Sequence, residues 1–175
     1  MTNQVTHKPT LVLMAGLPGA GKTTLASALG RILRWPVIDK DLLKSTLLAL
    51  QASEELAGPA SYELLFAIAE ELLVNQRLSL ILDSPALYLV NVERARAIVH
   101  AADAQLKVVL CRASRLLRNQ RLGSRISRAG QITQDLSTLD DDLLHYSHLP
   151  ADLLVVHTVN PPEECVQMAL SYIMH

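Results

Sequence analysis

Short runs of aliphatic residues alternate with longer amphipathic stretches along most of this chain. Within the short runs, apolar residues follow one another directly, which is typical of strands that are buried on both faces. Five such runs predict five strands, at residues 11–15, 37–38, 78–82, 106–111 and 153–157.

The longer stretches place their apolar residues three or four positions apart, as the buried side of a helix requires. Strands and helices in alternation predict an α/β fold, namely a three-layer α/β/α sandwich around a five-stranded parallel sheet. We expect residues 1–175 to form a single domain. Ligands of such sheets bind beyond the carboxyl ends of the strands, so the residues that follow each strand are candidates for a site.

Two stretches depart from this alternation. Residues 42–77 contain two helical patterns where one would connect the strands, and AGPA at residues 57–60 predicts the break between them. Residues 112–128 contain six arginines and precede a polar segment. Additional segments at the strand ends commonly bind or cover a substrate. We therefore expect acceptor-side helices over about residues 41–77 and a lid over about 112–140.

Composition and charge argue against two classes of binding partner, nucleic acids and acidic membranes. Half of the 175 residues are apolar and the formal net charge is −1, so no overall positive charge attracts a polynucleotide or an acidic membrane. Cys111 and Cys165 form no C-x-x-C pair, which argues against a disulfide framework or a zinc site. Neither a signal peptide nor an apolar run near the ~18 residues of a membrane span is present. We therefore expect a cytoplasmic protein.

The segment GLPGAGKT, residues 16–23, follows the first predicted strand and matches G-x-x-x-x-G-K-[ST] at every fixed position. Its glycines let backbone N–H groups point into one concavity, and the next helix adds its positive N-terminal end, so a polyphosphate meets several donors. Lys22 adds a charge for the outer phosphates and Thr23 a hydroxyl for Mg²⁺. The predicted nucleotide-binding residues are Gly16, Leu17, Pro18, Gly19, Ala20, Gly21, Lys22, Thr23 and Thr24.

Several segments together resemble a known family. They are GLPGAGKTTLA, VIDKDLLKS, LILDSPALY, the arginine-rich segment after VVLC, and HTVNPPEECVQMALSYI. They resemble the small P-loop kinases described as AAA-family ATPases, a group similar to zeta toxins, the kinase domain of polynucleotide kinases and chloramphenicol phosphotransferases. The resemblance implies the P-loop NTPase fold, with ATP and Mg²⁺ as cofactors. No motif in it is specific to one substrate.

Acidic residues follow two of the predicted strands. Asp39 and Asp41 come at the end of the second, where a kinase needs a carboxylate to orient the acceptor hydroxyl and accept its proton. In the resembling kinases the second of these acids has that role, which implies Asp41 here, with Asp39 acting on the metal through water. An N-cap of the next helix is an alternative role for Asp41. Asp83 ends the third strand and is a metal candidate, with an Asx-type turn before Pro85 as its alternative.

Arginines in a mobile lid can stabilise the charge of a transferring phosphoryl group. Arg121 and Arg125 are four residues apart and so share one helical face. The resemblance implies that Arg121 lies near the adenine or the phosphates and that Arg125 reaches the γ-phosphate, with Arg118 and Arg128 as further candidates. It also implies that residues 158–162 flank the adenine. A solvated basic face is the alternative for the whole segment.

The sequence thus predicts an ATP- and Mg²⁺-dependent kinase that phosphorylates a hydroxyl of a small molecule. The acceptor pocket is expected to be mostly apolar, with five candidate lining residues. A 5′-hydroxyl polynucleotide kinase is an alternative, although few aromatics are available for stacking on bases. A nucleotide-dependent switch or ATPase module is another. The sequence does not predict the acceptor, the choice between ATP and GTP, or the oligomeric state. The five candidates are Leu42, Leu43, Leu47, Tyr62 and Phe66.

Overall fold

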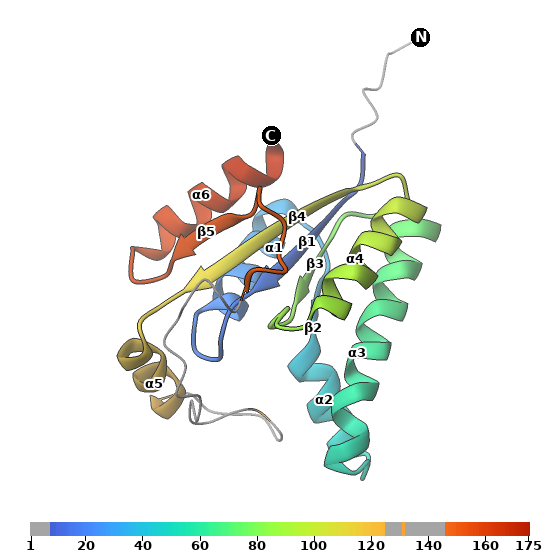
Figure 1. Ribbon diagram of the computed structural model, residues 1–175, viewed down its shortest axis with the longest axis horizontal. Coiled ribbons are helices and arrows are strands. Elements are labelled where there is room, and N and C mark those ends of the chain that lie inside the picture. Colours follow the sequence, from blue (N-terminus) through green and yellow to red (C-terminus); the bar gives the residue numbers. More distant parts are fainter. Residues whose placement is uncertain (1–7, 125–130, 132–145) are drawn as a thin grey trace.

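The computed structural model of the chain describes residues 8–124, 131 and 146–175. Its centre is a parallel sheet of five strands in the order β2-β3-β1-β4-β5 (Figure 1). The predicted five-stranded parallel sheet is thereby confirmed. The strands are β1 (Thr10–Ala15), β2 (Val37–Asp39), β3 (Leu80–Asp83), β4 (Gln105–Arg112) and β5 (Leu154–His157).

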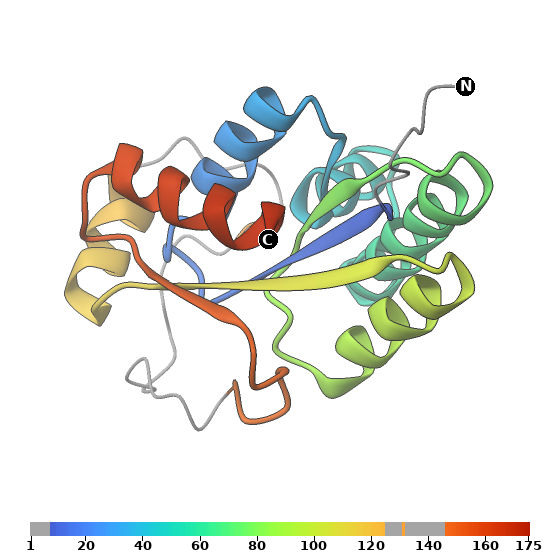
Figure 2. The same ribbon diagram turned by 90° about the horizontal axis from the view of Figure 1, so that it is seen from above.

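Helices cover both faces of this sheet (Figure 2). Helices α1 (Lys22–Leu33) and α6 (Pro162–Met174) cover one face. The other face is covered by α3 (Glu54–Glu70), the π-helical segment η1 (Glu71–Asn75) and α4 (Leu89–Ala101). Two further helices, α2 (Lys40–Ala49) and α5 (Arg115–Ser124), lie beyond the carboxyl ends of the strands, on opposite sides in Figure 1. Within the described ranges, no helix combines the length and apolarity needed to cross a membrane.

Strand β1 shows why apolar and polar residues do not alternate within the aliphatic runs. Leu11 and Leu13 pack into the core under α3 and α4, whereas Val12 and Met14 pack into the core under α1 and α6. All four side chains are completely buried. A strand between two layers of helices needs apolar residues on both of its faces, and this strand has them.

The break between the two acceptor-side helices lies elsewhere than the sequence predicts. Helix α2 ends before Gln51, which has a φ of 66°, and Ser53 caps α3 by accepting a hydrogen bond from the Leu56 N–H at 3.3 Å. The predicted break at residues 57–60 is wrong because Pro59 lies inside α3. A proline there removes one helical hydrogen bond, but Ala57 and Ser61 beside it are fully buried. Packing of this face therefore outweighs the local cost.

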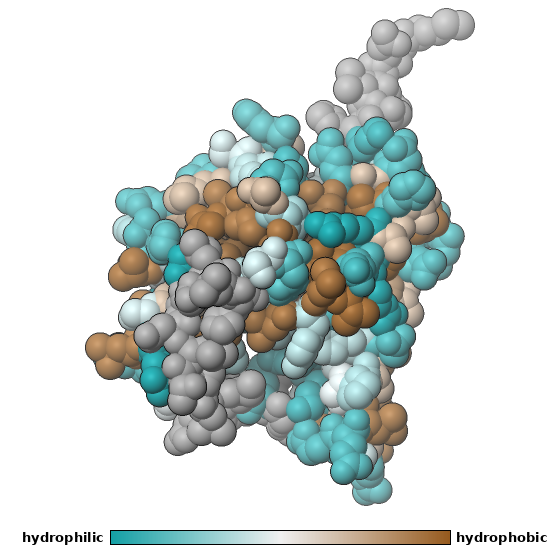
Figure 3. Space-filling view, viewed as in Figure 1, coloured by the Kyte–Doolittle hydropathy of each residue, from teal (hydrophilic) through white to brown (hydrophobic). Residues whose placement is uncertain are grey.

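Hydrophilic side chains cover most of the outer side of α3 and α4 (Figure 3). Brown, hydrophobic surface gathers near the middle of that view, over the start of α4. Leu89 and Val90 there are 50% and 55% exposed. The buried apolar residues of these helices face the sheet, but part of their apolar surface stays exposed at the start of α4.

Two helical glycines provide a matched test of this packing. A Cβ on Gly30 of α1 would overlap Cγ2 of Val37, whereas a Cβ on Gly58 of α3 would meet nothing within 4 Å. Alanine at either position raises helix propensity by about 1 kcal/mol. We expect Gly58→Ala to raise the free energy of unfolding by about that amount, and Gly30→Ala to lower it by about 1–3 kcal/mol because of overpacking. Urea unfolding followed by circular dichroism measures both; equal effects would contradict this packing.

Candidate active site

The turn between β1 and α1 has the backbone that its glycines predict. Gly16, Gly19 and Gly21 have φ values of 135°, 76° and 90°, a region that residues with a Cβ seldom adopt. Neighbouring segments also lie against this turn: a Cβ on Gly16 would overlap the carbonyl oxygen of Cys111, and one on Gly19 would lie 2.7 Å from that of Arg118. Glycine is therefore required at Gly16 and Gly19 for two reasons, the positive φ and the lack of space for a Cβ.

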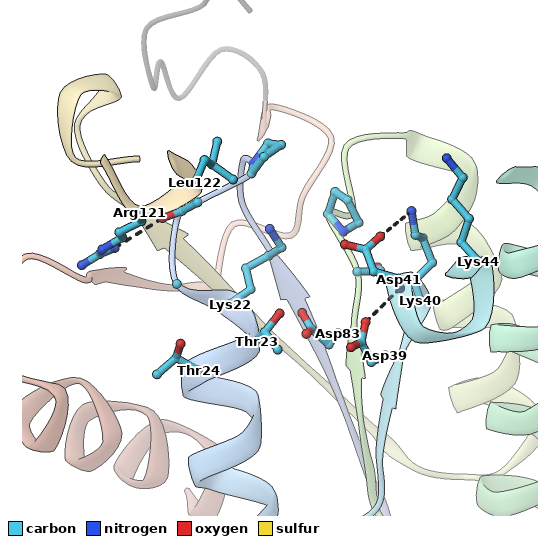
Figure 4. Close-up of a pocket in the computed structure, with 15 residues that line it drawn as sticks. Lys22, Thr23, Thr24, Asp39, Lys40, Asp41, Lys44, Asp83, Arg121 and Leu122 are labelled. Carbon is cyan, nitrogen blue, oxygen red and sulfur yellow. Dashed lines mark hydrogen bonds and ion pairs between the residues drawn. The ribbon is translucent and has the colours of Figure 1, made fainter. Parts of the chain in front are cut away.

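Lys22 and Thr23 begin α1 and face the open side of the turn (Figure 4). The Lys22 ammonium donates a hydrogen bond to the carbonyl oxygen of Leu17 at 3.0 Å, so it lies across the turn. A cavity of about 410 Å³ opens in front of it. This cavity is lined by Pro18, Gly19, Gly21, Lys22, Thr23, Thr24, Asp39, Lys40, Asp41, Lys44, Asp83, Ser84, Pro85, Arg121 and Leu122.

The pairing of β2 with β3 brings two of the predicted acids together, because the register places Asp39 beside Asp83. Burial raises the pKa of the Asp83 carboxyl, and the Lys22 ammonium and a hydrogen bond with the Thr23 side chain oppose part of that increase. The Oδ2 atom of Asp83 is buried and has no hydrogen-bond partner in the described structure. A buried carboxylate oxygen in that state is suited to a cation or to the water bound to one.

The described residues contain no cluster of three His, Cys, Asp or Glu side chains that could hold a metal unaided. Thr23 and Asp83 are instead a partial donor set of hydroxyl and carboxylate oxygens, which suits Mg²⁺ when phosphate oxygens and water complete its shell. Two of the three predicted metal residues, Thr23 and Asp83, therefore fit the ion, provided that a nucleotide is present, whereas the third, Asp39, uses one carboxylate oxygen to cap α2.

The two carboxylates after β2 have different local roles. Asp39 is the N-cap of α2, and its Oδ1 accepts hydrogen bonds from the N–H groups of Asp41 at 2.8 Å and Leu42 at 3.2 Å. The capping role considered for Asp41 is wrong, because α2 begins one residue before it. The Asp41 carboxylate points into the cavity instead, 2.9 Å from the Lys40 ammonium and 3.5 Å from the Gln131 amide nitrogen.

The arginine segment is only partly a solvated face. The Arg121 guanidinium donates to the Thr158 carbonyl oxygen at 2.6 Å and hydroxyl oxygen at 2.8 Å, and to the Gly19 carbonyl oxygen at 3.4 Å. Arg118 is completely buried, whereas Arg115 is exposed. Arg121 thus joins α5 to the glycine turn and to the segment after β5. Arg125 and Arg128, with much of the predicted lid, lie outside the described residues.

A second cavity of about 200 Å³ adjoins the first and shares Gly21, Thr24 and Arg121 with it. Thr158 and Asn160, which the resemblance placed beside the adenine, line this cavity. The two cavities therefore meet at the start of α1, one on each side of Arg121. The remaining lining residues are Leu25, Ala28, Pro162, Cys165 and Val166.

The acceptor side differs from the apolar pocket that the sequence predicts. None of the five apolar candidates lines the large cavity; Phe66 is 2% exposed and belongs to the core, whereas Leu42 faces solvent. Lys40, Lys44 and Ser84 line it instead. The sequence could have indicated the two lysines, because they follow Asp39 and are four residues apart. Residues at that spacing share one face of a helix.

The raised pKa of Asp83 makes a prediction about stability. Because the pKa in the folded state lies above that of the unfolded chain, the stability lost to ionisation of Asp83 accumulates as the pH rises from the unfolded-state pKa to the raised one. We expect Asp83→Asn to raise the Tm of the nucleotide-free protein by about 2–4 °C at pH 7, which corresponds to about 1 kcal/mol. The gain should shrink as the pH is lowered. Differential scanning calorimetry from pH 4.5 to 8 measures it.

The exposed Asp152 provides a control, since Asp152→Asn removes the same charge without a buried site. A Tm for Asp83→Asn that is unchanged or lower at pH 7 would show that the contacts with Lys22 and Thr23 outweigh the cost of burial.

Comparison with known proteins agrees with this geometry. The family described as AAA domain matches residues 11–146. A protein from Chloroflexus aurantiacus j-10-fl, provisionally described as a kinase, is 27% identical over 95% of this chain and 99% of its own, with a TM-score of 0.75. No curated protein matches the sequence.

Two more distant structures share the fold. The APS kinase of Mycobacterium tuberculosis, solved in complex with AMPPNP and APS, is 19% identical, with a TM-score of 0.70 and coverage of 97% of this chain and 99% of its own. A gluconokinase from Sinorhizobium meliloti 1021 is 18% identical, with a TM-score of 0.58 and coverage of 96% and 93%. The chain therefore has the fold of small P-loop kinases.

Proposed function

Because this chain belongs to the AAA domain family, we propose that it is an ATP- and Mg²⁺-dependent kinase that transfers the γ-phosphoryl group to a hydroxyl of a small-molecule acceptor. The observation that carries the proposal is the position of Asp41. Its carboxylate lies in the same cavity as Lys22 and the glycine turn, while the capping of α2 is done by Asp39. The structural neighbour at 27% identity, which is described as a kinase, supports the same reaction class.

The charged and hydroxyl residues around the glycine turn each have a role in the proposed reaction. The N–H groups of the turn and the Lys22 ammonium bind the β- and γ-phosphates, and Arg121, between the two cavities, lies beside the same phosphates. Mg²⁺, held through Thr23 and Asp83, would offset phosphate charge. Asp41 accepts a hydrogen bond from the acceptor hydroxyl and so orients its oxygen toward the γ-phosphorus.

The groups in the cavity account for each bond and proton that changes in the proposed transfer. The hydroxyl oxygen forms a bond to the γ-phosphorus as the bond from that phosphorus to the β–γ bridging oxygen breaks, and ADP leaves with the electron pair of the broken bond. The hydroxyl proton passes to the Asp41 carboxylate. The neighbouring Lys40 ammonium, 2.9 Å from Asp41 Oδ1, fixes the direction of that carboxylate.

The second cavity is a candidate for the nucleoside part of ATP. It adjoins the start of α1, and Thr158 and Asn160 offer polar groups to a base edge beside the apolar surface of Leu25 and Val166. A polynucleotide acceptor is less well supported, because neither described cavity has an aromatic residue in its lining on which a base could stack.

We expect Asp41→Asn to lower kcat about 100- to 10,000-fold while leaving ATP affinity within about twofold, since the amide cannot accept the proton and Asp41 does not hold the nucleotide. Acceptor-dependent ADP release and calorimetric ATP titration measure the two quantities. Asp152→Asn is the control, because it removes one aspartate charge at an exposed position outside both cavities. Full activity of Asp41→Asn, with ATP turnover independent of any acceptor, would favour a nucleotide-dependent switch over a kinase.

Removal of the Lys22 charge tests the nucleotide site itself. Lys22→Ala should weaken binding of Mg²⁺-ATP by about 10- to 100-fold, the range expected for hydrogen bonds between charged groups, and should leave the Tm of the nucleotide-free protein within a few degrees. Isothermal titration calorimetry with a non-hydrolysable ATP analogue gives the affinity. Equal affinity in wild type and variant would mean that this turn does not bind phosphates.

A further inference from the structure

The wall of the large cavity opposite Lys22 carries two lysines as well as two aspartates. It is formed by α2, where Lys40, Asp41 and Lys44 all line the cavity. Residues three and four apart on a helix are neighbours on one face, with Cβ atoms about 5–6 Å apart. Figure 4 shows the side chains of Lys40 and Lys44 leaving α2 on the side where Asp41 lies. Two ammonium groups therefore lie to one side of the carboxylate that is proposed to orient the acceptor, with Lys40 the nearer.

These two lysines differ in what they contact. The Lys40 ammonium pairs with Asp41 itself. The Lys44 ammonium pairs with Glu54 at 2.8 Å, but Glu54 is 64% exposed and is not part of the cavity wall, whereas the Lys44 side chain is only 18% exposed. Glu54 belongs to the first turn of α3 and holds Lys44 from the solvent side. Ion pairs with so exposed a partner are weak and are exchanged readily.

Ser84, which lines the same cavity from the end of β3, provides a second observation that favours a polar ligand. It is 1% exposed and directly follows Asp83. Its hydroxyl oxygen has no hydrogen-bond partner within the described residues. Buried hydroxyl groups are nearly always paired in folded proteins, so a ligand with hydrogen-bonding groups is the natural partner here. An apolar acceptor would leave Ser84 and both ammonium groups facing hydrocarbon.

We propose that the acceptor carries an oxyanion, a carboxylate or a phosphate ester, which Lys44 binds while Asp41 engages the hydroxyl one helical turn away. This inference rests on the proposed kinase reaction and adds the class of acceptor to it. The Lys44 side chain lines the cavity, is only 18% exposed and lies one helical turn from Asp41, so it is placed to reach a second group of an acceptor whose hydroxyl Asp41 binds. The acceptor is then a hydroxy acid or a sugar phosphate.

The test compares acids with their neutral counterparts as acceptors. Gluconate is compared with glucose, and ribose 5-phosphate with ribose, so that a carboxylate and a phosphate are tested separately. We expect ADP release to be stimulated by an acid at least tenfold more, in kcat/KM, than by its neutral partner. Lys44→Met should raise KM for that acid about 10- to 100-fold and leave kcat within about threefold, because Lys44 binds the acceptor and takes no part in phosphoryl transfer.

Glu54→Gln is the matched control, because it breaks the same ion pair but keeps the cation. Its KM for the acid should be unchanged or lower. Lys8→Met, which breaks the exposed pair with Asp103 far from the cavity, controls for loss of one positive charge. Thermal shift and calorimetry with the same acids, with ATP omitted, give binding independently of turnover.

The possible results separate the two proposals. Turnover of the neutral compounds equal to that of the acids, or equal effects of Lys44→Met and Glu54→Gln, would overturn the acceptor class and leave the kinase standing. Acid binding that needs Lys44, with no turnover of any compound, would support the oxyanion site and reject the kinase. Neither binding nor turnover with either acid would overturn the acceptor class, and absence of turnover with the neutral compounds as well would overturn both proposals.

Discussion

The turn between β1 and α1 depends on backbone approaches so close that no side chain fits between the segments. Gly16 lies against the carbonyl group of Cys111 in β4, Gly19 against the backbone of Arg118 in α5, and Gly21, less closely, against the side chain of Thr158 after β5. Three parts of the chain far apart in sequence thus meet at one turn. Because the strand that leads into it is completely buried, the turn is held at the carboxyl end of the sheet with little freedom. Preorganised N–H groups of this kind bind anions without having to be ordered first.

Charge in the site follows from that arrangement. The register of β2 with β3 places Asp39 next to Asp83, and the start of α1 brings Lys22 and Thr23 to the same place. The result is a compact set of opposite charges in which one carboxylate is buried and keeps an unpartnered oxygen. Such a set costs stability in the absence of a ligand, since a buried charge is satisfied only in part. Binding of the nucleotide and its ion would relieve that cost.

The side of the cavity formed by α2 has a different character. Capping by Asp39 fixes the first turn of α2, and this directs Lys40, Asp41 and Lys44 into the cavity rather than to solvent. One short helix thereby determines both the proposed orienting carboxylate and the charge of the acceptor pocket. In an α/β scaffold the sheet positions such elements, while the chemistry depends on the side chains at the strand ends.

Local signals in the sequence were sufficient for the sheet, its two layers of helices and the glycine turn, because each depends on periodicity or on backbone conformation that few residue types allow. They failed where a local preference competes with packing. Pro59 predicts a helix break, yet α3 continues through it because Ala57 and Ser61 are buried there. They also could not distinguish Asp39 from Asp41 as the cap, since one residue of shift in the start of α2 exchanges the two roles.

Tertiary structure decided which residues, besides the predicted ones, line the acceptor side of the cavity. The apolar residues proposed for the acceptor pocket have the same hydrophobicity whether they line a pocket or fill the core, and Phe66 proved to be core. The positions of Lys44 and Ser84 depend on the angle at which α2 leaves β2 and on the path of the chain after Asp83, and neither is encoded by neighbouring residues. Sequence therefore determined the fold and the phosphate-binding turn through local backbone constraints, whereas long-range packing determined the polarity of the pocket beside it.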